Sequence, residues 1–290
     1  MTLSKQFFQD IGAKIAERKC FSFAADAKTR EFLANYRWDH TGLQIPTVSS
    51  FRDIGAHLNL SSASNGKTLS NRMQKATAMS RTLAWLPISN ACKERVVRAN
   101  ILPTGLYAVE SSSVNQSALN TLRTAIANAI GPKSARANPD MVFNCTSCSG
   151  DLDPVVYILV ERVTALKRVM AKFPDTMQMI IDIIHNYNSN SNNQCLHTGP
   201  VAMLINDLKD HGASLTSNFV IQMDKEADID VLNMAWQHLK KAVAEIAIRK
   251  RNRNAAEKRT HMEGLQEVDT QMAHRIVNGM GEKRKKCTGT

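Results

Sequence analysis

The densest chemical signal in the sequence is a run of positive charge near its C-terminal end. Six cations lie within eleven residues: Arg249, Lys250, Arg251, Arg253, Lys258 and Arg259. Lys and Arg side chains at this density can neutralise several phosphates of a nucleic acid and release their counterions. No aromatic residue is interleaved in the run, which argues against stacking on unpaired bases there. We therefore expect sequence-nonspecific, salt-dependent phosphate binding, with a solvated helix face as the alternative.

The charge of the whole chain points to the same class of partner. The 290 residues contain 37 Lys and Arg against 26 Asp and Glu, a net charge of +11, which favours a polyanion. Positions 249–290 hold 11 basic and 5 acidic residues, so this end carries more than half of the excess. The KRKK sequence at 283–286 is compatible with a nuclear-import signal or with a solvated charged end.

Cysteine and histidine spacing raises the possibility of a zinc site. Cys145 and Cys148 have the spacing of a zinc knuckle, and Cys195 and His197 offer two further ligands. A C-x-H pair is unusual as the second half of a zinc motif, however, and about 46 residues of predicted helix separate the two pairs. We favour unligated thiols, and we expect no cofactor.

Paired carboxylates are the other candidates for chemistry. Asp151 and Asp153 could share a divalent cation. Helix capping explains them better, because Asp153 directly precedes Pro154, and Asp228 and Asp230 fit the same role before a long helix. The histidines are scattered, and we assign no catalytic residue.

Helices must position most of these side chains, because apolar residues recur every three or four positions from Lys67 onward. In the first helix, Leu69, Met73 and Leu83 share one face, while Lys67, Lys75 and Arg81 lie opposite. The expected helices cover 67–86, 90–103, 119–130, 154–173, 175–184, 200–212 and a span from about 230 into the basic run. The sequence thus predicts a mainly α fold.

Few other elements are expected. Short strands at 19–23 and 43–51 flank a helix centred on 29–36, and NFVIQM at 218–223 predicts a lone strand. The polar NYNSNSNN at 186–193 predicts a linker.

No apolar run has the length of a membrane helix or a signal peptide, so we expect an intracellular protein without membrane association.

Four stretches resemble one protein family in their order and spacing. They are FRDIGAHLNL at 51–60, NRMQKATAMSRTLAWLPIS from 71, RVVRANILPTGLYAVE from 95 and LRTAIANAIGP from 122. They resemble the region just after the palm of reverse transcriptases of non-LTR (LINE-type) retrotransposons. The similarity covers about 19–172, and it continues more loosely through GPVAMLINDLKDHGASL at 199–215 to the basic helix.

The resemblance, together with the composition of the linker and the tail, implies a domain order. Residues 1–60 would be a palm-end segment with short strands, 61–185 a thumb-like helical bundle and 186–199 a linker. A basic helical C-terminal module would follow at 200–260, with a basic, disordered tail at 261–290. The basic faces of such a thumb grip the template–primer duplex. The side chains implied are Lys67, Arg72, Lys75, Arg81, Arg95 and Arg98.

The sequence departs from this family in the residues needed for catalysis. Polymerisation needs clustered aspartates that hold two Mg²⁺ ions, and the chain contains no Asp-Asp pair. The family places that pair upstream of Lys19, where this sequence has 18 residues. We expect a nucleic-acid-binding fragment of a polymerase polyprotein that is not catalytic alone. A helical protein-interaction module, or a decayed retroelement product without a specific function, is the alternative.

Overall fold

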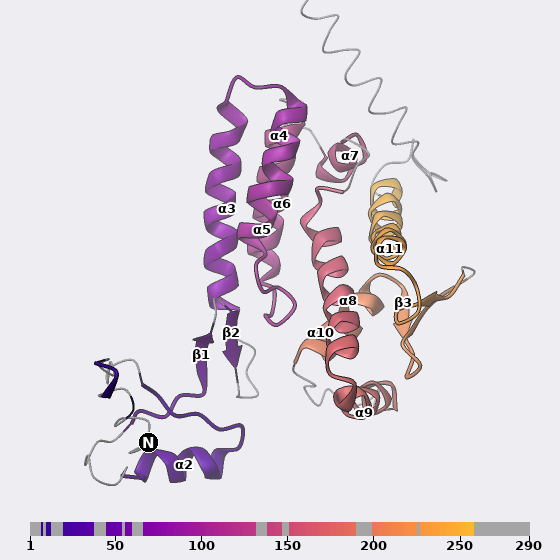
Figure 1. Cartoon of the computed structure of the whole chain (residues 1–290). Helices are drawn as coiled ribbons and strands as arrows, with labels where there is room; N and C mark the ends of the chain where they lie inside the picture. Colours follow the sequence, from indigo (N-terminus) through magenta and orange to yellow (C-terminus); the bar gives the residue numbers. More distant parts are fainter. Residues whose placement is uncertain are drawn as a thin grey trace, which may run out of the picture. The chain divides into compact units, whose positions relative to one another are not determined.

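The chain forms two compact units, Met1–Asn65 and Gly66–Thr290, which are described separately. The computed structural model describes residues 7, 10–12, 20–37, 45–53, 56–59, 66–131, 138–146, 151–189, 199–224 and 227–257. These residues are mainly helical, which confirms the predicted fold class (Figure 1). Among them, no helix is both long and apolar enough to cross a bilayer.

The first unit combines one helix with a hairpin. Helix α2 (Ala27–Asn35) begins where the Asp26 carboxylate accepts a hydrogen bond from the Thr29 N–H, a standard N-cap. Strands β1 (Ser50–Asp53) and β2 (Ala56–Asn59) pair antiparallel. The helix expected near position 30 is therefore present. In the described residues the strands expected at 19–23 and 43–51 are reduced to one bridge between Ser22 and Thr47, and the hairpin begins where the second expected strand ends.

The second unit opens with a bundle of helices. Its elements are α3 (Lys67–Trp85), α4 (Asn90–Val96), the π-helix η2 (Val97–Ile101), α5 (Leu102–Gly105) and α6 (Gln116–Ile130). Helix α3 lies alongside α6 and packs on α5 (Figure 1). Gly105 permits this packing, because a Cβ there would lie 2.7 Å from the Cβ of Ala76.

The rest of the unit adds a small sheet to further helices. The order is α7 (Pro139–Asn144), α8 (Pro154–Lys172), the 3-10 turn η3 (Pro174–Thr176), α9 (Met177–Ser189), α10 (Pro200–Asp210), β3 (Ala213–Leu215), β4 (Val220–Met223), β5 (Ile229–Asp230) and α11 (Trp236–Glu257). The strands are antiparallel in the order β3-β4-β5. Helix α11 packs along α8 (Figure 1).

Two hydrophobic cores meet at α8. Ile158 belongs to the core formed mainly by α3 to α7, whereas Leu159 and Val163 belong to the core formed with α9, α10, the sheet and α11. The second core takes side chains from both sides of the expected linker. Residues 186–189 of that linker are helical, as the end of α9, and 190–198 lie outside the described residues.

Two expectations near the C-terminal helix are wrong. The strand predicted at 218–223 is not alone, because β4 is the middle strand of a sheet. The long helix begins at Trp236 and not near Asp230. The Asp230 carboxylate instead accepts the N–H groups of Leu232 and Asn233, both at 2.9 Å, and so stabilises the turn before α11.

Candidate nucleic-acid interface

Helix α3 presents a continuous exposed stripe that contains cations and no carboxylate. Leu69, Met73 and Leu83 are buried against the bundle, which leaves the opposite side in solvent, as predicted. No Asp or Glu occurs in α3. Its exposed residues recur every three or four positions and therefore share one side of the helix: Lys67, Asn71, Gln74, Lys75, Ala78, Arg81, Thr82 and Trp85.

A groove between α3 and the start of α6 borders this stripe. Its volume is about 420 Å³. Arg81 is the one charged residue among the described residues that line it. The others are small or neutral and polar, apart from two alanines: Ser70, Gln74, Thr77, Ala78, Asn115, Ser117, Ala118 and Thr121.

Hydrogen bonding within the helices decides which groups can serve a ligand. The Thr77 and Thr121 hydroxyls donate to the carbonyls of residues 73 and 117, each at 2.8 Å, so these hydroxyl hydrogens are already used. The Asn115 Oδ1 accepts the N–H of Ala118 as the cap of α6, which leaves its NH₂ group as a donor. The donors suited to a phosphate therefore include the amides of Asn115 and Gln74 and the guanidinium of Arg81.

The other cations predicted on this half of the chain lie elsewhere. The Arg72 guanidinium donates to the Tyr107 carbonyl at 3.0 Å and lies 5.0 Å from the centre of the Tyr107 ring. It therefore helps to hold the segment after α5 against α3. Arg95 is exposed on α4 and Arg98 is half-buried on η2, and neither lines the groove.

The C-terminal basic run does not form one exposed patch. Arg251 is 4% exposed, and its guanidinium pairs with Asp151 at 2.8 Å and Asp153 at 3.3 Å. The expectation that Arg251 contacts phosphate is wrong, because its charge is buried and neutralised inside the protein. Arg253 is exposed, Arg249 and Lys250 are half-buried, and Lys258 and Arg259 lie outside the described residues.

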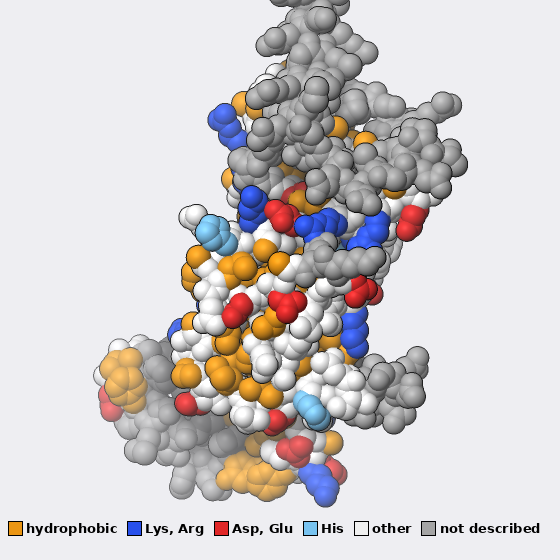
Figure 2. All heavy atoms as spheres, turned by 90° about the vertical axis from the view of Figure 1, so that its right-hand side faces the viewer, with side chains coloured by type: hydrophobic (Ala, Val, Ile, Leu, Met, Phe, Trp, Pro, Cys, Tyr) orange, Lys and Arg blue, Asp and Glu red, His pale blue; other side chains and the backbone are white. Residues whose placement is uncertain are grey.

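The surface around α11 also mixes both signs of charge. In Figure 2, which faces this side of the molecule, Lys and Arg side chains gather at the level of α11, and Asp and Glu side chains lie among and below them. Acidic neighbours repel the phosphates that the cations would attract. Since α3 carries no acidic residue, it is the better candidate for a nucleic-acid interface.

Arg251 belongs to a buried ionic network centred on Asp153. The Arg123 guanidinium contacts the Asp153 and Asp140 carboxylates, each at 2.6 Å. Burial disfavours the charged form of Arg123, but these two carboxylates outweigh it and hold its pKa above the usual value. Burial raises the pKa of Asp151, and Arg251 opposes that rise. The predicted cap is confirmed, because Asp153 also accepts the Val155 N–H at 3.1 Å.

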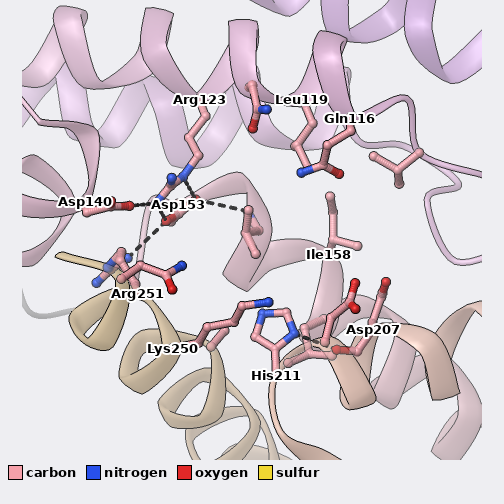
Figure 3. A pocket seen from close by; sticks show the side chains of 17 residues that line it. Gln116, Leu119, Arg123, Asp140, Asp153, Ile158, Asp207, His211, Lys250 and Arg251 are labelled. Atoms are coloured by element: carbon pink, nitrogen blue, oxygen red, sulfur yellow. Dashed lines mark hydrogen bonds and ion pairs between the residues drawn. The ribbon is translucent and has the colours of Figure 1, made fainter. Parts of the chain in front are cut away.

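A polar cleft of about 270 Å³ lies beside this network, between α6, α8, α10 and α11. Figure 3 shows Lys250 and His211 next to each other on one wall, with Gln116 of α6 on the other. Burial lowers the pKa of His211, and the Lys250 charge acts in the same direction. Asp207 lines the same cleft and pairs with Arg162 at 2.5 Å. Because both signs of charge line the cleft, it favours neither an anion nor a cation.

The zinc hypothesis rests mainly on residues outside the described part of the chain. Cys145 is half-buried, and burial raises the pKa of its thiol, which disfavours the thiolate that zinc requires. Cys148, Cys195 and His197 fall among the residues that are not described. Within the described ranges, no group of three or more potential ligands comes together.

The sequence predicted Lys67, Lys75 and Arg81 as one basic face, and the structure brings them to the exposed stripe of α3. The sequence did not predict the groove or the network around Asp153. Both depend on contacts between separate helices, and no local sequence pattern predicts such contacts.

Comparison of the chain with family models, with curated proteins and with solved structures finds no match in any of the three.

Proposed function

We propose that this chain binds nucleic-acid duplexes through the stripe of α3 and its groove with α6, and that it does so without sequence specificity. One observation carries the proposal: Lys67, Lys75 and Arg81 are exposed on one side of a helix that contains no carboxylate. Phosphate contacts position a protein on a duplex but carry no sequence information. The net charge of +11 adds a general attraction for polyanions.

The spacing of the three cations suits a phosphate backbone. At 1.5 Å per residue, Lys67 and Lys75 stand about 12 Å apart along the helix, and Lys75 and Arg81 about 9 Å. One strand of a duplex carries a phosphate for each ~3.4 Å of its axis, so each cation can reach a different phosphate. Three such contacts to DNA predict a slope of about −2.7 for the logarithm of the binding constant against that of salt concentration.

We further propose that the chain is the part of a LINE-type reverse transcriptase polyprotein that follows the palm, with α3 to α6 acting as a thumb. The support is the resemblance of 51–60 and of the stretches from 71, 95 and 122. A basic helical face beside a polar groove fits that role. We do not expect the isolated chain to polymerise DNA, because it lacks an Asp-Asp pair.

Fluorescence anisotropy with a labelled duplex at 50 to 300 mM salt tests the proposal. We expect micromolar binding at 50 mM salt, lost at a few hundred millimolar. Replacing Lys67, Lys75 and Arg81 by Gln should weaken binding roughly tenfold or more and reduce the salt slope by about 2.7.

The control replaces two other exposed lysines and one other exposed arginine by Gln: Lys240, Lys241 and Arg168. It removes the same charge from α8 and α11, so general attraction falls equally in both variants. Equal loss of binding in the two variants would contradict a specific interface on α3. Absence of binding at 50 mM salt would refute the function.

A further inference from the structure

The polar cleft between α6, α8, α10 and α11 contains some charged groups that the fold has already paired. Arg123 and Arg251 line it, and buried aspartates neutralise both guanidiniums. These two cations are therefore not available to a ligand. The binding character of the cleft depends on the side chains that such contacts leave open.

A cation and a carboxylate remain open in the cleft. Lys250 of α11 and Asp210, the last residue of α10, both line it, and neither makes a hydrogen bond or an ion pair within the described part of the chain. Both charges act on the imidazole of His211, so they lie close to the same ring. Figure 3 shows Lys250 beside His211. A ligand can therefore meet both charges at one place.

The end of the cleft formed by α10 offers several hydrogen-bond acceptors. Asp207 lies one turn before Asp210, and its Oδ2 pairs with Arg162, which leaves Oδ1 open. The His211 Nδ1 lies 2.6 Å from the Asp207 carbonyl, and because a carbonyl only accepts, this nitrogen carries the hydrogen. Burial lowers the pKa of His211, so the ring is neutral at pH 7 and its Nε2 accepts. Carboxylate and imidazole acceptors suit an ammonium group.

Three side-chain amides add neutral polar groups to the lining. Gln116 and Asn120 are one turn apart on α6, and Asn254 lies one turn beyond Lys250 on α11. A side-chain amide both donates and accepts hydrogen bonds. None of these three amides bonds to another described residue. They suit a ligand that has an amide or a hydroxyl group of its own.

The size and charge of the cleft limit what it can hold. Its volume is about 270 Å³, below the roughly 300–1,000 Å³ typical of sites for drug-sized ligands, so the occupant is small. Among the described residues no three potential metal ligands converge, so the acceptors fit an ammonium better than a metal ion. An anion alone would meet the carboxylates, and a cation alone would meet Lys250. A molecule that carries both charges avoids both conflicts.

We propose that this cleft binds a small zwitterion, a free α-amino acid with a polar side chain. The carboxylate of the ligand contacts Lys250. Its ammonium contacts Asp210 and the Nε2 of His211, and its side chain contacts the amide of Gln116. In an α-amino acid both charged groups are attached to one carbon, which suits a cation and a carboxylate beside one imidazole. The proposal is independent of duplex binding, because none of these residues lies on α3 or lines its groove.

NMR titration of the full chain with L-glutamine tests the proposal. The side-chain amide resonances of Gln116, Asn120 and Asn254 should shift, with a dissociation constant on the order of 1 mM. Glutaramate lacks the ammonium of L-glutamine, and L-glutaminamide lacks its carboxylate. Each analogue should bind at least about tenfold more weakly, the effect of one lost charged contact.

Two variants assign the charges to their partners. Lys250→Gln should weaken the binding of L-glutamine about tenfold. It should leave the binding of L-glutaminamide unchanged, because that analogue has no carboxylate to lose. Asp210→Asn should weaken L-glutamine to a similar extent and leave glutaramate unchanged. The matched controls, Lys241→Gln and Asp224→Asn, change exposed residues that do not line the cleft and should behave as the parent chain.

Three results would each overturn the inference. The first is that the three amide resonances do not shift at about 10 mM L-glutamine, about ten times the expected dissociation constant. The second is equal binding of L-glutamine and its two analogues, because the paired charges would then not decide the affinity. Both of these results come from the parent chain and do not depend on the folding of a variant. The third is an unchanged affinity for L-glutamine in both cleft variants.

Discussion

At the scale of single residues, neighbouring charges on α11 have opposite environments. Arg251 is buried and Arg253 is exposed, although one residue separates them. Two residues on an α-helix point about 200° apart, so when one faces the protein the other faces water. Arg251 meets Asp151, Asp153 and Asn144 on α7 and at the start of α8. Its role is therefore to neutralise buried carboxylates.

Replacing Arg251 by Met should destabilise the fold by about 3–5 kcal/mol. Methionine fills much of the same space, but it leaves Asp151 as a buried charge without its cation. The same change at exposed Arg253 should alter the free energy of unfolding by less than about 0.5 kcal/mol. Urea denaturation measures both. Adding Asp151→Asn to Arg251→Met should recover part of the loss, and equal midpoints for the two single variants would contradict this account.

His211 should make the stability of the fold depend on pH. Burial holds its pKa below the usual 6.5, so the unfolded chain binds more protons than the folded chain below that pH. This contribution of His211 to stability is fully present above pH 6.5, and it is lost as pH falls through the pKa of His211 in the folded chain. Urea midpoints should drop from pH 7.5 to 5.5, and drop less in His211→Gln.

The matched control for this measurement is His238→Gln, because the His238 side chain is exposed on α11. It should show the same fall in midpoint as the parent chain. If the urea midpoints of the parent chain and of His211→Gln fall equally, the burial of His211 does not govern the pH dependence.

At the scale of elements, α5 and α6 both pack closely on α3, and the groove lies between α3 and α6. Gly105 sets this distance, since a Cβ at that position would lie 2.7 Å from Ala76 and 3.5 Å from the nearest Leu122 methyl. Real Cβ atoms do not approach a neighbour as closely as 2.7 Å. A side chain at 105 would therefore push α5 away from α3.

Gly105→Ala should consequently destabilise the fold by about 1–3 kcal/mol, the cost of overpacking. Ala76→Gly in the same chain should relieve the clash, although a glycine within α3 costs about 1 kcal/mol of helix stability by itself. Thermal unfolding of the two single variants and the double variant measures the coupling. Additive effects would show that the two positions do not compete for space.

At the scale of the whole molecule, α8 connects two hydrophobic cores. Ile158 packs in one core and Leu159 in the other, so unfolding α8 exposes both. A helix shared in this way couples the halves of Gly66–Thr290. The segment 186–199 therefore does not divide the core of this unit, although its composition predicted a linker.

We expect Gly66–Thr290 to unfold in one transition because of this shared helix. Trp85 and Trp236 lie at the ends of α3 and α11 and report on different halves. Variants that keep only one tryptophan can follow each half by fluorescence during urea denaturation. The two probes should give the same midpoint within error. Midpoints separated by more than about 0.5 M would indicate two independent domains.

The sequence by itself determined most of the helices and several of their ends. The three- and four-residue spacing of Leu119, Leu122 and Ile126 predicted α6, and Asp153 before Pro154 predicted the start of α8. These signals are local, because a helix bonds residues four apart and a cap acts within one turn. The basic face of α3 follows from the same periodicity.

Only the tertiary structure decided which charges stay in water. Arg123 and Asp153 are 30 residues apart, and Arg251 and Asp153 are 98 apart, so no sequence pattern links them. Arg249, Lys250, Arg251 and Arg253 point to different sides of α11, and the sequence does not say which side meets α8. Packing buries Arg251, forms the groove beside Arg81 and leaves Trp85 exposed. The physical reason is that burial of a charge or an indole depends on the neighbouring helix, which lies far away along the chain.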